Sequence, residues 1–368
     1  MNNKSPLLLV GIGGAGSAMA RGVSRAFGES MRYVLADTDA STGRPGVPFV
    51  LLGGDRLSGH GSGGDVVQAR LAAEDSLKSF EEPLEGVRLA VVLAALGGGT
   101  GGGATLEVVK HFDKCGVPAI VFATLPFSFE GEERQRRARG MMSMIDEAAS
   151  AAIFVHLDNL IEGADKMDDA MRRAVDTLAS GVTLFWRLLE KPGYIRLDAE
   201  RVRKIVAHAG RGRFAVVTMQ GPSRAPEAVD ALTRSPLLAA AAGPVRSILC
   251  GVLAGEDLRL SEVGCIAEGV RDAFGRRATF DLATVNDEAT FTGRIAVVVM
   301  LFESGGDERE SDEEGKTPAS SKRGKRAKNP LAQGPQGRGR FNNVEPTVWN
   351  GEDLDTPTFI RRNISLDL

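Results

Sequence analysis

The sequence is poor in cysteine and histidine, and this scarcity limits the kinds of site that it can form. Its three cysteines are widely spaced and odd in number, which argues against a disulfide framework or a zinc site and favours a reducing compartment. The four histidines are scattered along the chain. We therefore expect no metal held by a cluster of protein side chains.

Long apolar runs are also missing. No stretch approaches the ~20 apolar residues that a membrane span needs, and the residues before the first apolar run are too few for a signal peptide or an anchor. With 45 basic and 48 acidic residues, the net charge of −3 creates no general attraction to nucleic acid or to a membrane surface. We expect a cytoplasmic protein that neither inserts into a membrane nor binds nucleic acid.

The sequence lacks a standard P-loop as well. Gly315-Lys316-Thr317 resembles the end of that motif, but Glu310 stands at its first glycine position. A phosphate site would have to be built from other glycines.

Glycine is abundant where two apolar runs end. The first such run, residues 91–96, is followed directly by Gly97, Gly98, Gly99, Thr100, Gly101, Gly102 and Gly103. A loop of this kind at the start of a helix exposes backbone N–H groups, and the helix dipole also favours negative charge there. The run predicts a phosphate-binding loop, with Thr100 as its side-chain donor; the alternative is a flexible connector.

The second cluster follows the apolar run 7–10 and comprises Gly11, Gly13, Gly14 and Gly16. It predicts a strand, a tight turn and a helix over residues 15–27. Gly11, Gly13 and Gly16 match the dinucleotide fingerprint, and Asp37 follows at the end of a second strand, so an NAD-dependent oxidoreductase is one alternative. Two glycine loops at adjacent strand ends fit better with one nucleotide that has a longer phosphate chain.

The rest of the chain alternates apolar runs with helical patterns, which predicts βαβ units and a parallel sheet. Strands are expected over residues 119–125 and 214–219, among others, and a long helix over residues 165–189. Past residue 304 the composition changes, because residues 307–314 are acidic and residues 316–328 are basic, with few apolar residues. Such a segment is expected to stay flexible. Its basic block could instead contact nucleic acid or anionic lipid.

These motifs carry a resemblance to FtsZ, the bacterial tubulin-like division GTPase. The two glycine loops, Asp37-Thr38-Asp39 and residues 126–131 resemble that family, and residues 353–362 resemble its C-terminal adaptor peptide. The resemblance implies the tubulin/FtsZ fold: an α/β, Rossmann-like parallel-sheet GTP-binding domain, a central helix, a smaller α+β domain and a disordered tail. The implied bounds are 1–164 for the nucleotide domain, 165–190 for the central helix, 191–304 for the C-terminal domain, 305–346 for the linker and 347–368 for the adaptor peptide.

The resemblance also implies a function. It predicts a cytoskeletal protein that binds GTP or GDP with Mg²⁺, polymerises head to tail with itself for cell division, and hydrolyses GTP between subunits. A membrane-tethering adaptor would bind residues 352–362, and the protein would lie in the cytoplasm at the division site.

Family positions suggest roles for individual residues. The run Gly97–Gly103 would hold the distal phosphates, the N-terminal glycines the inner phosphates, and the loop with Gly61 and Gly63 would sense the terminal phosphate. Glu130 and Arg134 match ribose-contacting positions, although Arg134 could be one more exposed charge on its helix. Asp176 stands at the guanine-recognising position, where a carboxylate can accept from two base donors. The alternative is that Asp176 is merely exposed.

Catalysis would involve the stretch 191–201, which matches the loop that enters the next subunit's site. Asp198 matches the first acid, whereas Arg201 replaces the second and Glu200 lies one residue away. Arg196 replaces an asparagine. This pattern predicts slow hydrolysis, with a firmer contact between subunits; the alternative is a filament former with little or no GTPase activity.

Overall fold

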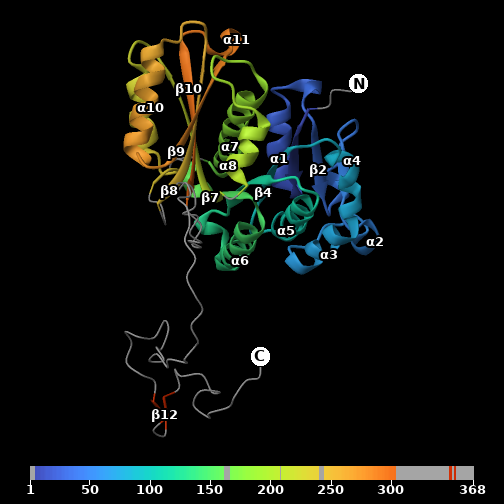
Figure 1. Ribbon diagram of the computed structural model, residues 1–368. Helices are drawn as coiled ribbons and strands as arrows, with labels where there is room; N and C mark the ends of the chain where they lie inside the picture. Colours follow the sequence, from blue (N-terminus) through green and yellow to red (C-terminus); the bar gives the residue numbers. More distant parts are fainter. Residues whose placement is uncertain are drawn as a thin grey trace, which may run out of the picture. The chain divides into compact units, whose positions relative to one another are not determined.

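The computed structural model describes residues 5–160, 166–207, 209–239, 244–303, 348–349 and 352–353 (Figure 1). Two compact units, residues 1–309 and 310–368, are distinguished along the chain. In the second unit, β11 (Val348–Trp349) and β12 (Glu352–Asp353) form a short antiparallel ladder. The predicted linker 305–346 and all of the predicted peptide except this ladder lie outside the described residues.

The first unit is built on one sheet of ten strands in the order β3-β2-β1-β4-β5-β6-β7-β10-β8-β9. Strands β1 to β6 and the β6–β7 pair are parallel, β10 is antiparallel to β7 and β8, and β8 and β9 are parallel. The strands are β1 (Leu7–Ile12), β2 (Tyr33–Asp37), β3 (Phe49–Leu51), β4 (Leu89–Ala95), β5 (Ala119–Leu125), β6 (Ala151–His156), β7 (Gly210–Gln220), β8 (Val245–Ala254), β9 (Thr279–Asn286) and β10 (Arg294–Glu303).

Eleven α-helices are assigned among the described residues, and several are short. They are α1 (Gly13–Ser24), α2 (Gly54–Leu57), α3 (Val66–Ser76), α4 (Glu81–Leu84), α5 (Gly99–Lys114), α6 (Glu132–Ala148), α7 (Met167–Glu190), α8 (Ala199–Val206), α9 (Arg224–Arg234), α10 (Leu260–Phe274) and α11 (Glu288–Phe291). In the part of the chain that the structure describes, none of the helices combines the length and the apolar character needed to cross a bilayer.

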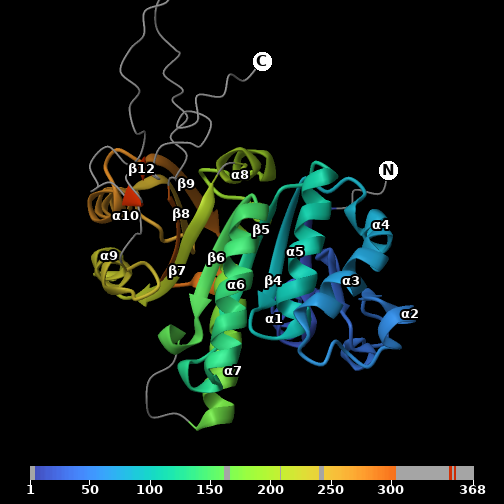
Figure 2. The same cartoon turned by 90° about the horizontal axis from the view of Figure 1, so that it is seen from below.

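Buried residues alternate along the parallel strands, and each set packs under its own helices. Leu7 and Leu9 of β1 share one apolar core with Val23 of α1 and Phe185 of α7, whereas Leu8 belongs to a second core. This second core contains side chains of α3, α5 and α6. The strands are thus buried on both faces, as parallel sheets require, and Figure 2 shows α5 and α6 lying over one face.

Helix α7 connects the two parts of the sheet. Its buried residues Val182, Phe185 and Leu188 share one core with Leu9 of β1 and with Val298 of β10. A third core lies under α9 and α10, against β7, β8 and β10. The predicted α/β architecture with a central helix is confirmed, whereas the exact domain bounds stay predictions.

The observed elements differ from the expected ones at two places. Helix α1 begins at Gly13, two residues before the expected start, because the second half of the glycine cluster forms its first turn. Strand β7 begins at Gly210 and not near residue 214, because its first residues pair with β6 and its last with β10. Tertiary pairing lengthens this strand beyond its apolar core.

Candidate functional site

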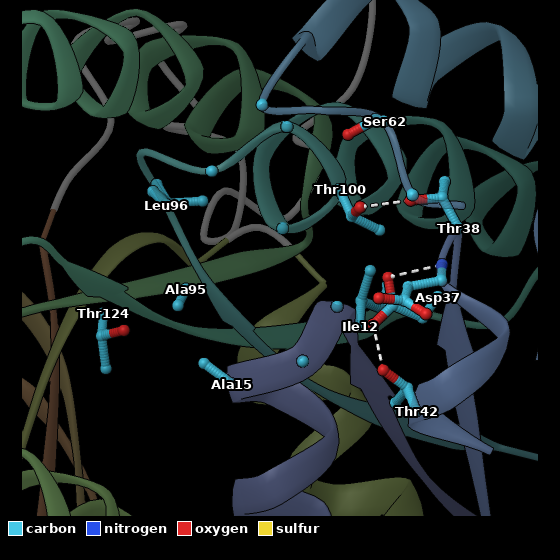
Figure 3. A pocket seen from close by; sticks show the side chains of 18 of the residues that line it. Ile12, Ala15, Asp37, Thr38, Thr42, Ser62, Ala95, Leu96, Thr100 and Thr124 are labelled. Carbon is cyan, nitrogen blue, oxygen red and sulfur yellow. Dashed lines mark hydrogen bonds between the residues drawn. The ribbon is translucent and has the colours of Figure 1, made fainter. Parts of the chain in front are cut away.

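A cavity of about 560 Å³ opens where the parallel strands β1, β2, β4 and β5 end. Ligands of open α/β sheets bind at this edge, outside the carboxyl ends of the strands. Figure 3 shows residues from several elements converging on it: Ile12 at the end of β1, Ala15 from α1, Thr38 after β2, and Thr100 from α5. Strands β1 and β4 are direct neighbours, so the two glycine clusters meet at this cavity.

Two helices begin at the cavity without a side-chain cap. The N-cap residues are Ile12 for α1 and Gly98 for α5, and neither side chain accepts a hydrogen bond from the first turn. By contrast, Asp65 caps α3 by accepting from the N–H groups of Val67 (2.8 Å) and Gln68 (3.1 Å). The first turns of α1 and α5 therefore offer backbone donors and two positive dipole ends to one anion.

The glycines of the two clusters divide into two groups by what surrounds them. Gly13, Gly14, Gly98, Gly99 and Gly101 line the cavity. At Gly14 and Gly98 a Cβ atom would meet nothing within 4 Å, so the backbone there is open to a ligand.

The remaining glycines of the clusters serve close packing. A Cβ at Gly11 would lie 2.7 Å from Ala20 of α1, and one at Gly102 would lie 2.8 Å from Met141 of α6. At Gly16 and Gly103 it would overlap backbone carbonyl oxygens of β4 and α3. Gly97, with φ of +99°, forms the turn before α5. These five were predicted to contact phosphate, but none of them lines the cavity.

Polar side chains from β2 and α5 form one side of the cavity. The hydroxyls of Thr38 and Thr100 share a hydrogen bond of 2.7 Å, so Thr100 is already oriented (Figure 3). The Thr42 hydroxyl donates to Asp37 at 2.7 Å. Burial raises the pKa of the Asp37 carboxyl, and the hydrogen bond from Thr42 opposes that shift. A carboxylate this close to a phosphate site is a repulsive element unless a proton or a cation neutralises it.

The loop that contains Gly61 and Gly63 closes another side of the cavity. Both glycines line it, together with His60 and Ser62. The Gly61 N–H donates to the Thr38 carbonyl at 3.0 Å, which ties the loop to the end of β2. Arg137 of α6 donates to the carbonyl of Gly64 at 2.7 Å. The loop is therefore fixed from two directions while its glycine backbone faces the cavity.

Glu130 and Arg134 both line the cavity and form an ion pair with each other. The Phe127 N–H donates to Glu130 Oε1 at 2.8 Å, so this carboxylate is held by the chain after β5. The Arg134 side chain stays half exposed. The structure thus brings both predicted ribose-contacting residues to the rim of the site.

Asp176 is exposed and does not line the cavity. The preceding residue, Val175, does. The structure therefore favours the alternative of an exposed Asp176 and presents an apolar side chain where a base acceptor was expected.

Asp198, Glu200 and Arg201 lie at the start of α8 and do not line the cavity of their own chain. Asp198 caps α8 by accepting from the Arg201 N–H at 2.7 Å. Glu200 accepts two hydrogen bonds from Arg203, at 2.9 and 3.0 Å, and these lower its pKa. Arg201 binds Asp281 of β9 through its Nε at 2.6 Å. Its positive charge is thus balanced within the chain.

Backbone contacts attach the segment before α8 to the outer edge of β9. The Thr284 N–H donates to the Ile195 carbonyl (2.8 Å), and the Ile195 N–H donates to the Thr284 hydroxyl (2.9 Å). A Cβ at Gly193 would overlap the Thr284 carbonyl, so only glycine allows this approach. The segment presents Tyr194 to solvent with 74% of its surface exposed.

Sequence reasoning did not assign several lining residues to the site, among them His60, Ser62, Thr124, Leu157 and Val175. The available signals were the surrounding glycine loop for Ser62 and the end of a predicted strand for Thr124. Val175 carries no such signal, because its place depends on how α7 is rotated.

Known proteins resemble this chain in both sequence and fold. Residues 6–165 match the sequence model of the Tubulin/FtsZ family, GTPase domain. An empty FtsZ dimer from M. jannaschii is 24% identical, with a TM-score of 0.75, and the match covers 85% of this chain and 95% of that chain. A GTPγS-bound protofilament of CetZ2 from Haloferax volcanii is 23% identical, with a TM-score of 0.69 and coverage of 82% and 94%. CetZ from Methanosaeta thermophila is 17% identical, with a TM-score of 0.64 and coverage of 82% and 87%.

These similarities establish the fold. The chain has the tubulin/FtsZ fold, and its residues 6–165 match the sequence model of the GTPase domain of the Tubulin/FtsZ family. FtsZ and CetZ structures share this fold with the chain, so the narrower assignment to FtsZ stays a prediction. The matched segment contains both glycine clusters, including the N-terminal cluster on which the oxidoreductase alternative depended.

Proposed function

We propose that the protein binds GTP in the cavity and assembles head to tail into filaments. The observation that carries this proposal is the meeting of two uncapped helix N-termini, α1 and α5, around a glycine-lined cavity in a segment that matches a GTPase domain family. A polyphosphate supplies the negative charge that both helix ends favour.

Mg²⁺ fits the chemistry of this cavity. Asp37, Thr38, Asp39 and Thr100 offer oxygen atoms on one side of it, and Mg²⁺ binds through one or two carboxylates together with phosphate oxygens. Among the residues for which the structure gives positions, no group of three or more His, Cys, Asp or Glu side chains is placed to hold a metal ion. The nucleotide would therefore complete the cation's coordination, and the cation would offset the charge of Asp37.

Assembly would complete the catalytic site. Asp198 and Glu200 do not line their own chain's cavity, so in this proposal they act on the nucleotide of the next subunit. The solved relatives include an FtsZ dimer and a CetZ2 protofilament, which supports self-association. A heterologous contact of this kind extends into an open filament. We further propose a role in cell division, at the division site in the cytoplasm, with an adaptor bound to residues 352–362.

Sedimentation tests the proposal directly. The purified chain is centrifuged with Mg²⁺ and GTP, GDP, NAD or no nucleotide, at low and moderate salt. We expect a pellet only in the samples that contain GTP. Retained GTP binding without a pellet under any condition would contradict the head-to-tail contact, and binding of NAD but not GTP would overturn the nucleotide assignment.

We propose that hydrolysis is slow because of the charges at α8, and the second candidate is a filament former with little or no GTPase activity. Glu200 accepts hydrogen bonds from Arg203, and Arg201 occupies the position where the resemblance implies an acid.

Changing Arg201→Asp alone would place a second carboxylate beside that of Asp281. The exchange Arg201→Asp with Asp281→Arg keeps an ion pair possible and adds the missing acid. We expect faster phosphate release from this double variant than from the parent, with Asp281→Asn as the control; equal rates would show that position 201 does not limit hydrolysis.

A further inference from the structure

Away from the starts of α1 and α5, the cavity is lined by apolar side chains together with Thr124, at the end of β5. Val175 from α7, Leu157 after β6 and Met19 from α1 form its apolar wall. Met19 lies six residues beyond Gly13, which is ~9 Å along the helix from its N-terminus. A nucleotide with its phosphates at the starts of α1 and α5 would place its base against this wall.

The apolar wall is backed by further apolar packing. Leu157 and Ala174 form a small buried cluster with Phe127. The polar lining side chains Thr38 and Ser62 lie near Thr100 of α5, across the cavity from Thr124 (Figure 3). Among the side chains of α7 that the structure describes, Val175 lines the cavity and Asp176 is exposed.

The rotation of α7 explains this difference between neighbours. Successive residues of an α-helix are ~100° apart. Ala174 and Leu178 are buried in the apolar cores, so the helix faces the protein on that side. Val175 stands at the edge of this buried face, and Asp176 is turned further round to solvent.

Guanine is distinguished from adenine by acceptors that face its N1–H and its 2-amino group. An isopropyl group offers no acceptor, and an apolar pocket discriminates weakly between bases of equal shape. We propose that Val175 sets a relaxed base specificity, so that the site takes purine nucleoside triphosphates as a class and not GTP alone. This inference rests on the proposed nucleotide site and concerns its substrate range.

Equilibrium binding of fluorescent analogues of GTP, ITP and ATP to the full chain tests the inference. ITP lacks the 2-amino group, so it reports on that contact alone. We expect GTP and ITP to bind within about threefold of each other and ATP within about tenfold of GTP. Val175→Asp is expected to shift the ratio at least tenfold towards GTP, whereas Val175→Ala weakens all three ligands alike.

The variant Asp176→Asn distinguishes this inference from the recognition of guanine by Asp176 that the sequence predicted. We expect the GTP-to-ATP ratio to stay within twofold of the parent, as for the neighbouring exposed control Thr177→Ala. A preference for GTP over ATP above a hundredfold in the parent, abolished by Asp176→Asn, would overturn the inference and leave the nucleotide site intact. Absence of binding by all three nucleotides would instead overturn the proposed function itself.

Discussion

At the scale of single residues, Asp37 is the side chain whose chemistry conflicts most with an anion site. Its carboxyl is buried at the end of β2 and lines the cavity, and burial raises its pKa. The raised pKa means that the neutral form is favoured to a higher pH than for an exposed aspartate. A bound polyphosphate favours that neutral form further.

This charge conflict predicts pH-dependent nucleotide binding. Without Mg²⁺, affinity should rise as pH falls through the pKa of Asp37, because protonation removes the repulsion. Asp39 and His60 also face this region, so titration calorimetry is best done in a His60→Gln background. There, Asp37→Asn should bind several-fold tighter at neutral pH and show a flatter profile; an unchanged slope would assign the pH dependence to another group.

Arg201 shows how a residue acquires a role from a distant partner. Its guanidinium binds Asp281, 80 positions later in the chain. From sequence alone, Arg201 was expected to bring its charge towards a neighbouring subunit's nucleotide. In the structure this charge is already paired with Asp281 of the same chain. The pairing gives no reason to expect the firmer contact between subunits that the sequence predicted.

At the scale of elements, α5 depends on glycine for its close approach to its neighbours. Gly103 is buried against α3, where a Cβ would overlap the Val66 carbonyl. In α6, by contrast, a Cβ at Gly140 would meet nothing within 4 Å. Two helical glycines thus differ only in their surroundings.

Replacing these two glycines with alanine should change stability in opposite directions. Gly103→Ala should lower the free energy of unfolding by about 1–3 kcal/mol through overpacking, whereas Gly140→Ala should raise it by about 0.5–1 kcal/mol through helix propensity. Urea denaturation followed by circular dichroism gives both values. Equal effects would mean that α3 and α5 can separate without cost.

The first turn of α1 allows a separate test of ligand approach. A Cβ at Gly14 would project into open space beside the cavity. Gly14→Ala should therefore leave the free energy of unfolding within about 0.5 kcal/mol of the parent while weakening nucleotide binding at least tenfold. Unchanged affinity would show that the phosphates do not approach this turn.

At the scale of the whole molecule, the nucleotide cavity and the α8 region lie on different strands of one sheet. The cavity is built on β1, β2, β4 and β5, whereas the segment before α8 is attached to the edge strand β9. The apolar core under α7 extends from β1 to β10 and makes these parts one body. A single chain therefore presents a binding site and, at a separate place, the groups proposed to act on a neighbour's nucleotide.

Loosening the segment before α8 should impair turnover without affecting binding. Thr284→Val removes the hydroxyl that accepts from the Ile195 N–H and keeps the side-chain shape. We expect the GTP dissociation constant to stay within twofold, and phosphate release per subunit at polymerising concentrations to fall several-fold. Thr233→Val on α9 is the threonine control, because the Thr233 side chain is exposed and its hydroxyl donates only to Val229 of the same helix. A matching fall in the control would point to a general loss of stability.

Local patterns along the chain were enough to predict the architecture and the edge of the sheet at which the cavity opens. Apolar runs of strand length, separated by helical patterns, predicted the parallel sheet, and the glycine clusters at two strand ends predicted where the cavity would open. These signals are local, because a strand end, a turn and a helix start lie within a few residues of one another.

Which glycine of a run, or which of two neighbouring helix residues, faces the cavity depends on tertiary packing. Gly98 is open to the cavity while Gly102 packs on Met141, although both belong to one run. Val175 lines the site and Asp176 does not, because a helix turns ~100° per residue and its rotation is set by packing against the sheet. Arg201 is paired by a strand 80 residues away. Local pattern carries no information on such distant neighbours, and they determine orientation, burial and charge.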